Sequence, residues 1–461
     1  MELNGIHLSS LLITLIIVIG SSLYSSRSVK SAQDYSLGGR TAGAPLIAGC
    51  IAGTVVGGGA TVGTAQLAYS AGLSAWWFTL GSGIAFIIMG LFYARPLRST
   101  GLETIPQYLV LNYGKKAGPI ASVISSIGIL FSAVASCLPA IQIIAAIFTI
   151  TPWMAAILLI FLVTAYVFFG GMKGSGISGM LKLGIVWLTL FAAGETAYSA
   201  LQSMSALEIV FPFSPWFSLF GNGFGAALSN LFSLIVGIIC TQTYIQAVFS
   251  ASDSRTASIG AFTAALVVIP VGLPSIAIAM YMQAAHPPVL PILVLPIYLL
   301  QYQPAWLGGV GLAGILLSLI GSIAGLSLGI GTMVAKDLCF ELLQIKAEKT
   351  LLWINRITVL SVTLTAVLIA ILNLKSQVLA WNYLSMALRG SGVFLPLSLA
   401  IFAPGRLKKS WAISSMMIST AAAVGCAILR LPLDPLSAGI TVSTVIISFG
   451  LIRSGQNTET N

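Results

Sequence analysis

Charged residues are scarce in this sequence: only 7% of its 461 residues are Asp, Glu, Lys or Arg, whereas 57% are hydrophobic. The mean hydropathy is +1.01. A water-soluble domain could not cover so much apolar surface with so few charges. Apolar stretches long enough to cross a bilayer recur from one end of the chain to the other. We therefore expect residues 1–461 to form a single polytopic membrane domain.

Ligands for a metal or a cofactor are also scarce. The five cysteines show no CxxC spacing, and the only histidines are His7 and His286. These residues offer neither a disulfide framework nor a zinc or iron centre. The sequence also lacks a recognisable pair of nucleophile and base. We expect no enzymatic activity and no cofactor other than a coupling ion, which would be sodium or a proton.

The net charge of +10 comes from basic residues that cluster in short segments between the apolar stretches, such as 95–116 and 406–409. These segments fall on alternate sides of the expected spans, as the positive-inside rule requires. The charge therefore indicates topology and not binding to nucleic acid. We expect a cell membrane protein (plasma or inner membrane) with the N-terminus outside, the C-terminus in the cytoplasm and a disordered tail at 454–461.

About thirteen apolar stretches have the length of a membrane-spanning helix. They predict an all-α integral membrane fold. The expected spans are 7–26, 44–71, 74–95, 117–147, 151–170, 176–199, 223–249, 258–284, 306–336, 350–373, 379–402, 410–429 and 436–452.

Three consecutive glycines interrupt the second expected span. Gly57, Gly58 and Gly59 lie in the middle of the apolar run 44–71, with threonines on both sides. Such a sequence should break the helical hydrogen-bond ladder at mid-membrane depth, where freed backbone groups are tolerated only if they line a cavity or hold an ion. We therefore expect a binding site at this break. Simple close packing of helices is the alternative.

A weaker interruption lies in the seventh span, 223–249, where Gly237 precedes a polar trio that begins at Thr241. Two interrupted helices five spans apart are expected of an inverted five-helix repeat with the site between its halves. The first repeat would cover 44–199 and the second 223–402. The expected solute-binding residues near the two breaks are Gly57, Gly58, Gly59, Ala60, Gly237 and Thr241.

Three ionisable side chains lie within the expected spans. Arg389 is about ten residues into its span, roughly 15 Å and close to mid-bilayer, and Lys182 is about 9 Å from the cytoplasmic end of its own span. Glu195 is near the outer end of that same span. Embedding such residues is costly, so a functional role is the first hypothesis for each.

Arg389 has two possible roles. It could bind a substrate carboxylate or phosphonate with two hydrogen bonds, or it could tie helix ends together through backbone carbonyls. Because no acid lies deep in the core, an anionic or zwitterionic organic solute is favoured over a polyamine or a bare metal ion. An aromatic cage for a quaternary amine could use Tyr69, Trp76 and Trp77, although such residues more often form an interfacial belt.

Five segments carry a family resemblance, in order along the chain. They read AQDYSLGGR at 32–40, AYSAGL at 68–73, FGGMKG at 169–174, YIQAVF at 244–249 and GTMVAKDL at 331–338. Together they resemble the sodium:solute symporter family, which includes sodium/proline, sodium/pantothenate and sodium/sugar carriers. The resemblance implies the same inverted repeat, with sodium bound by carbonyls of the broken helix and hydroxyls of the ninth span. In this sequence the implied cation ligands are Gly53, Val56, Ser318 and Ser322, while Gly321 supplies no side chain.

The chain departs from the family pattern at two positions of the sixth span. Gly179 stands where the family usually has an aspartate that supports the sodium site, and Lys182 stands where it has a glutamine. The ammonium of Lys182 could take the place of the ion and exchange a proton during transport, or its stem could snorkel to the cytoplasmic headgroups. The contacts of sugar carriers are also missing, because Ala60, Leu234 and Gly237 replace them, so a sugar is a poor candidate.

We expect a secondary carrier that moves a small organic solute by alternating access, with sodium as the coupling ion implied by the resemblance. A proton-coupled or uncoupled carrier that uses Lys182 in place of sodium is an alternative. A passive channel and a transporter-like sensor are further alternatives, and the channel would need a continuous polar lining. The expected partners are the solute and the lipid bilayer, and the expected functional unit is a monomer.

Overall fold

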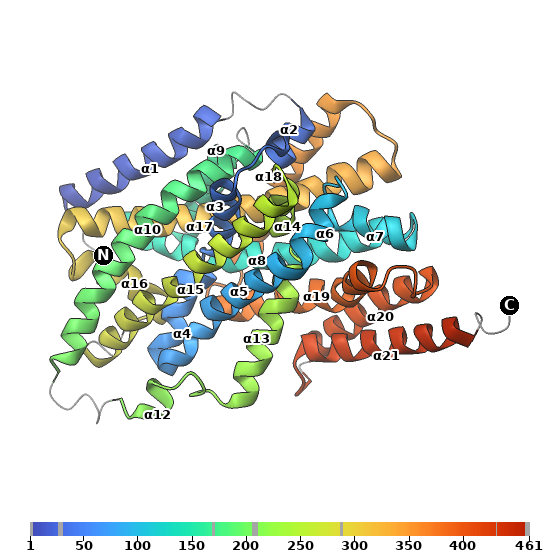
Figure 1. Cartoon of the computed structure of the whole chain (residues 1–461). Helices are drawn as coiled ribbons and strands as arrows, with labels where there is room; N and C mark the ends of the chain where they lie inside the picture. The colour runs from blue at the N-terminus through green and yellow to red at the C-terminus, as the bar shows by residue number, and fades with distance from the viewer. Residues whose placement is uncertain are drawn as a thin grey trace.

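The computed structural model describes residues 3–25, 31–167, 171–204, 211–285, 289–429 and 431–456. Within these ranges the regular structure is helical, apart from one isolated bridge between Ala42 and Ala251. Figure 1 shows the helices packed into one bundle, with α1 at one side and α20 and α21 at the opposite side.

The α-helices carry the labels of Figure 1. Their bounds are α1 Gly5–Ser25, α2 Ala32–Leu37, α3 Ala44–Val55, α4 Thr64–Ala71, α5 Trp77–Ile88, α6 Ala94–Ser99, α7 Ile105–Tyr113, α8 Ala117–Phe148, α9 Pro152–Val167, α10 Gly171–Gln202, α12 Phe213–Trp216, α13 Phe224–Ile239, α14 Gln242–Phe249, α15 Ser254–Ala285, α16 Val294–Gln301, α17 Ala305–Met333, α18 Glu348–Ile371, α19 Val378–Phe402, α20 Lys409–Ile428 and α21 Pro435–Gln456.

Ten helical stretches in the described ranges are long and apolar enough to cross a membrane, or eleven when α13 and α14 count together as one span. The expected all-α membrane fold is therefore confirmed. The number of thirteen spans stays a prediction, because α3 and the described part of α9 are each shorter than a membrane-spanning helix. A short helix, α7, lies in the basic segment 95–116 between two expected spans.

Helix α17 lies at the centre of the bundle. Of its most apolar stretch, 89% is buried, against 28% for α1 and for α21, so the latter two lie at the lipid-facing periphery. Helix α17 packs against α1, α8, α10 and α18, and it also contacts α3. A helix that contacts so many others can join the two interrupted helices to the rest of the bundle.

The first break divides the second expected span into α3 and α4. Helix α3 ends at Val55, and Val56 leaves the helical region with ψ at 70°. The N–H of Gly57 donates to the carbonyl of Val55 at 2.8 Å, whereas a continuous α-helix would direct it to Gly53. A π-helical turn over Gly59–Gly63 then leads into α4. The interruption expected from the glycine run is confirmed.

The second break separates α13 from α14, which meet at an angle of 49°. Helix α13 ends at Ile239, and the N–H of Thr241 donates to the carbonyl of Ile238 at 3.1 Å. In a continuous helix the same N–H would donate to Gly237. The break therefore leaves the Gly237 carbonyl without its usual backbone partner, at the position that the sequence predicted.

Helix α15 contains Pro270 and Pro274, each of which removes one N–H from the helical ladder. Close to them, the indole N–H of Trp76 donates to the carbonyl of Ile269 at 2.8 Å. The indole of Trp77 donates to the carbonyl of Leu219 at 2.7 Å. These two tryptophans therefore join separate segments of the bundle through their N–H groups.

Some expectations fall at the edges of the described ranges. Helix α21 runs to Gln456, past the expected start of the disordered tail at 454, and residues 457–461 lie outside the described part. His286 and the family-like pair at 169–170 also lie outside it.

Candidate solute and cation sites at the helix breaks

Helices α3 and α10 approach each other through glycines beside the first break. A Cβ atom at Gly179 would lie closer than 3.0 Å to the carbonyl oxygen of Gly49, and a Cβ atom at Gly53 would lie 3.0 Å from the Cα of Gly179. Small residues allow this close contact between membrane helices. An aspartate at 179 therefore does not fit in this packing.

Lys182, on the next turn of α10, brings a positive charge to the first break, opposite in sign to that of an aspartate. Its side chain is 1% exposed, and its Nζ donates to the carbonyl oxygen of Ser318 on α17 at 3.2 Å. The Nζ lies 2.5 Å from the point that a Cβ atom of Gly321 would occupy. The missing side chain at 321 thus makes room for the ammonium, which points into the bundle and not toward the headgroups.

The expected cation ligands lie at the same junction of helices, and the Ser318 carbonyl is the one that accepts from this ammonium. The hydroxyl of Ser318 donates to the carbonyl of Val56, where α3 ends. Ser136 of α8 donates to Oγ of Ser322 at 3.2 Å, and a Cβ atom at Gly57 would lie 2.5 Å from that same Oγ. The structure therefore brings the predicted cation-site residues together between α3, α10 and α17, and they are Gly53, Val56, Ser318, Ser322 and Lys182.

The glycine run is closely packed in this conformation. A Cβ atom at Gly58 would lie 2.9 Å from the carbonyl of Ala135, and one at Gly59 would lie 2.9 Å from the amide nitrogen of Asn382 and closer still to the ring of Phe78. Ala60 is fully buried. The residues predicted to contact solute are therefore surrounded by α5, α8, α17 and α19, and these neighbours must move before a solute can enter.

The carbonyl of Gly237, freed by the second break, receives two side-chain donors. Thr241 donates through its hydroxyl at 2.6 Å, and Arg389 donates through Nε at 3.1 Å. The guanidinium also donates through its terminal nitrogen to Ser132 at 3.3 Å and to the hydroxyl of Ser385. Arg389 is 1% exposed. These contacts tie α13 to α8 and α19, as the second of the two roles considered for this arginine requires.

Polar side chains that the sequence did not single out connect the two breaks. Ser132 and Ser385 share a hydrogen bond of 2.7 Å beside Arg389, while Ser136, one turn from Ser132, contacts the first break. Asn382 of α19 borders the glycine run, and the same helix carries Arg389 two turns further on. The available signal for Ser132 and Ser136 was their spacing of four residues, which places them on one face of α8.

The end of the bundle that carries the basic segments is closed by polar contacts. Glu103 lies 3.3 Å from the ammonium of Lys336 and 3.9 Å from the guanidinium of Arg40. Next to it, Thr104 donates to the carboxylate of Asp337 at 2.7 Å. These contacts join the segment before α7 to the end of α17 and to the entry of α3.

Known transporters are similar to this chain in sequence. High affinity choline transporter 1 of Homo sapiens is 25% identical over 415 residues, which cover 85% of this chain and 71% of that protein. The transporter of the same name from Drosophila melanogaster is 24% identical over 381 residues, covering 77% of this chain and 60% of that protein.

Solved structures show the fold. A Na+-coupled sialic acid symporter in a substrate-bound, outward-open state matches with a TM-score of 0.82 at 18% identity, covering 99% of this chain and 98% of that one. A nucleobase-cation-symport-1 family transporter matches with a TM-score of 0.59 at 11% identity, covering 91% and 94%. The fold is thus the leucine-transporter type, with an inverted five-helix repeat and two broken helices.

A sequence model of the sodium:solute symporter family matches residues 35–419. This range contains both helix breaks together with Lys182, Ser318 and Arg389. The family and the similar proteins are transporters and not enzymes, and they support sodium-coupled symport as the general activity. The chain belongs to the sodium:solute symporter family.

Proposed function

We propose that this chain is a cation-coupled symporter that moves a small anionic or zwitterionic organic solute by alternating access. Sodium is the coupling ion that the family supports. The observation that carries the proposal is the pair of helix breaks, each of which frees a main-chain group inside a membrane-spanning helix. The solute would bind between the breaks, the outer path would close, and the polar contacts around Glu103 would then separate to open the inner path.

The charges beside the breaks support a solute with a negative group. Lys182 and Arg389 are both buried there, and among the described residues no Asp or Glu is buried beside them. A carboxylate gains from fixed positive charges in a low-dielectric site, whereas a cation would be repelled by them. Arg389 would share its guanidinium between the Gly237 carbonyl and the solute, or would hold α13 in the shape that the solute requires.

The names of the relatives favour a second solute class, the quaternary ammonium cation. Phe78, which borders Gly59, and Tyr383 form an edge-to-face pair with ring centroids 6.3 Å apart. Aromatic faces can bind such a cation. This class would have to tolerate the two buried positive charges, and for that reason we place it second.

A panel of solutes tests the solute class. Purified full-length protein in proteoliposomes would be given an inward sodium gradient and, in parallel, a neutral amino acid, a monocarboxylate or choline. We expect saturable, protein-dependent uptake of the zwitterion or the carboxylate that stops when the gradient is dissipated. Uptake of choline alone would overturn the proposed class, and single-channel currents faster than carrier turnover would indicate a channel. Solute binding without any uptake would indicate a sensor.

A second candidate concerns the coupling ion. The ammonium of Lys182 lies in the space that Gly321 leaves open and donates to Ser318, among the residues implied as sodium ligands. A lysine at this position can supply the positive charge itself and can exchange a proton as the site opens to either side. The carrier would then be coupled to protons at this site, or would work as a facilitated exchanger.

Separate gradients distinguish the two coupling candidates. Uptake would be measured with a sodium gradient at equal pH and with a pH gradient at equal sodium, in the wild type and in Lys182→Ala. Proton coupling predicts uptake driven by the pH gradient and loss of that drive in the variant. Uptake that follows sodium alone, with a normal Lys182→Ala variant, would reject it.

Topology and assembly complete the proposal. We place the protein in the cell membrane with the N-terminus outside and the C-terminus in the cytoplasm, because the basic segments alternate with the spans. One chain would be the functional unit, since both breaks and all candidate ligands belong to it. Labelling of a cysteine introduced at Ser9, which lies near the start of α1, with an impermeant thiol reagent in intact cells tests the orientation.

A further inference from the structure

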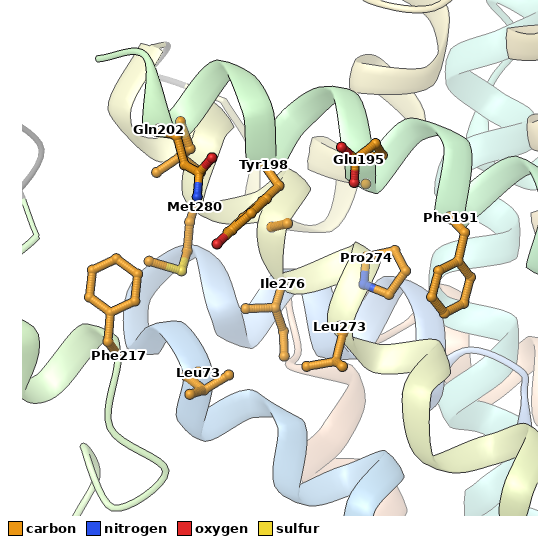
Figure 2. A pocket seen from close by; sticks show the side chains of 13 residues that line it. Leu73, Phe191, Glu195, Tyr198, Gln202, Phe217, Leu273, Pro274, Ile276 and Met280 are labelled. Carbon is orange, nitrogen blue, oxygen red and sulfur yellow. The ribbon is translucent and has the colours of Figure 1, made fainter. Parts of the chain in front are cut away.

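A cavity of about 320 Å³ lies between the outer halves of α10 and α15, away from both helix breaks. Figure 2 shows its lining, which comes from several segments and is mostly apolar; it includes Leu73, Phe191, Tyr198, Phe217, Ile276 and Met280. The two helices touch at Gly194, where a Cβ atom would lie 2.6 Å from the Cβ of Pro274, and the cavity lies beside this contact. Its volume is within the usual range for small-molecule sites.

Glu195 is the one charged side chain among the described residues that line this cavity. In the described part of the chain, Glu195 forms no ion pair with a Lys or Arg. Its carboxylate accepts one hydrogen bond there, from the hydroxyl of Ser199 at 3.3 Å. Glu195 is itself exposed, near the end of α10, and it places a negative charge at the edge of an apolar cavity, where a cation can pair with it. Neither the proposed solute path nor the cation site uses this residue.

The surroundings of the cavity indicate how a ligand would arrive. Tyr198 is 53% exposed and Leu273 is also exposed, and both lie on helices long and apolar enough to span a membrane, α10 and α15. A ligand that partitions into the outer leaflet can therefore reach the cavity from the side. Such a ligand needs an apolar body for the walls and one positive charge for Glu195.

We propose that this cavity is a binding site for an amphiphilic organic amine, whose protonated nitrogen pairs with Glu195 and whose apolar body lies between α10 and α15. The site is separate from the proposed transport site. Because α10 also carries Gly179 and Lys182 against the first break, an occupied cavity would hold α10 against α15 and slow the opening of the bundle. We therefore expect the amine to inhibit uptake without competing with the solute.

Direct binding tests the proposal without relying on transport. The probes are 4-phenylbutylamine, which is protonated at neutral pH, and the uncharged 4-phenylbutan-1-ol. Both would be titrated calorimetrically into the full-length protein in phosphatidylcholine nanodiscs. We expect Glu195→Gln to weaken amine binding about fivefold or more and to leave alcohol binding unchanged, as for a partly exposed ion pair. Glu341→Gln, which changes an exposed acid beside a different cavity, is the matched control.

A second pair of variants tests the location. Ala277→Phe fills the cavity from α15 and should weaken binding of both probes, whereas Leu266→Phe changes an exposed position of the same helix and should not. Equal amine affinity in the wild type and in Glu195→Gln would overturn the proposal, as would alcohol binding as tight as amine binding, which would indicate a site for a lipid chain. Inhibition that solute relieves competitively would place the cavity on the transport path and would also overturn it.

Discussion

The two helix breaks satisfy their freed backbone groups in different ways. At the first break, the carbonyl of Val56 receives the neutral hydroxyl of Ser318, and the ammonium of Lys182 lies next to it. At the second break, the carbonyl of Gly237 receives the hydroxyl of Thr241 and the guanidinium of Arg389. Each break thus combines one hydroxyl with one buried basic residue, but the chemistry of the basic residue differs.

This difference suggests a division of roles. Arginine stays charged in proteins, so Arg389 can give the second break a permanent positive charge and a fixed geometry. Lysine can lose its proton when it is buried, so the charge at the first break can change during a transport cycle. The second break is therefore suited to holding helix ends or a solute carboxylate, and the first to coupling.

The largest expected effect is at Arg389. Arg389→Gln removes the charge and most of the donors that hold Gly237, Ser132 and Ser385, so we expect uptake of an anionic or zwitterionic solute to fall at least about tenfold, the equivalent of one lost charged hydrogen bond. Uptake in proteoliposomes measures this, with Arg406→Gln, at an exposed loop position, as the control. Unchanged solute affinity in Arg389→Gln would remove the residue from the solute site.

The next effect is on the helix contact that supports the first break. In Gly179→Ala the new Cβ would overlap the Gly49 carbonyl, so α3 and α10 must move apart. We expect a loss of about 1–3 kcal/mol in stability, typical of overpacking. Gly184 lies on the same helix, and a Cβ atom there would have nothing within 4 Å. We therefore expect Gly184→Ala to change the stability little. Thermal unfolding of the two variants measures the difference, and equal melting temperatures would contradict the close contact.

A smaller effect is expected at Ser318. Ser318→Ala removes the hydroxyl donor to Val56, and we expect it to destabilise the protein by about 1 kcal/mol, as for one buried hydrogen bond. It should also change the ion dependence of uptake, because the same residue contributes to the cation site. A variant with unchanged ion dependence would show that the hydroxyl only packs the helices.

The smallest effect is expected at Thr241. Thr241→Val removes one of the two donors to the Gly237 carbonyl, while Arg389 still donates to it. We therefore expect the free energy of unfolding to fall by less than about 1 kcal/mol. Thr263→Val, which removes a similar hydroxyl contact on the surface of α15, is the matched control. A larger loss of stability in Thr241→Val than in Ser318→Ala would contradict the account, because the second break would then depend more on its hydroxyl than the first.

The sequence was sufficient to predict both breaks, because glycines and polar residues inside an apolar run cannot be left facing lipid. It also singled out Lys182 and Arg389, because charges within spans are costly. Their partners could not be predicted from local pattern, since Ser318 lies 136 residues from Lys182 and Gly237 lies 152 residues from Arg389. Such pairs depend on helix packing.

Packing also explains what the sequence left open. Gly321 leaves space for the ammonium of Lys182, and this relation exists only because α10 packs against α17. In the sequence, Trp76 and Trp77 could be recognised only as amphipathic side chains. In the fold, their indole N–H groups donate to backbone carbonyls that lie far away in the sequence. The serines of α8 were hidden among many serines, which often bond to their own helix.

The central claim is that a sodium ion bound at the first break is coupled to solute uptake. Sodium binding to the purified full-length protein tests it most directly, in the wild type, in Ser318→Ala and in Lys182→Ala. The account predicts that the wild type binds sodium and that Ser318→Ala weakens this binding. Sodium binding that appears only after Lys182 is removed would contradict the claim and would support the alternative in which the lysine takes the place of the ion.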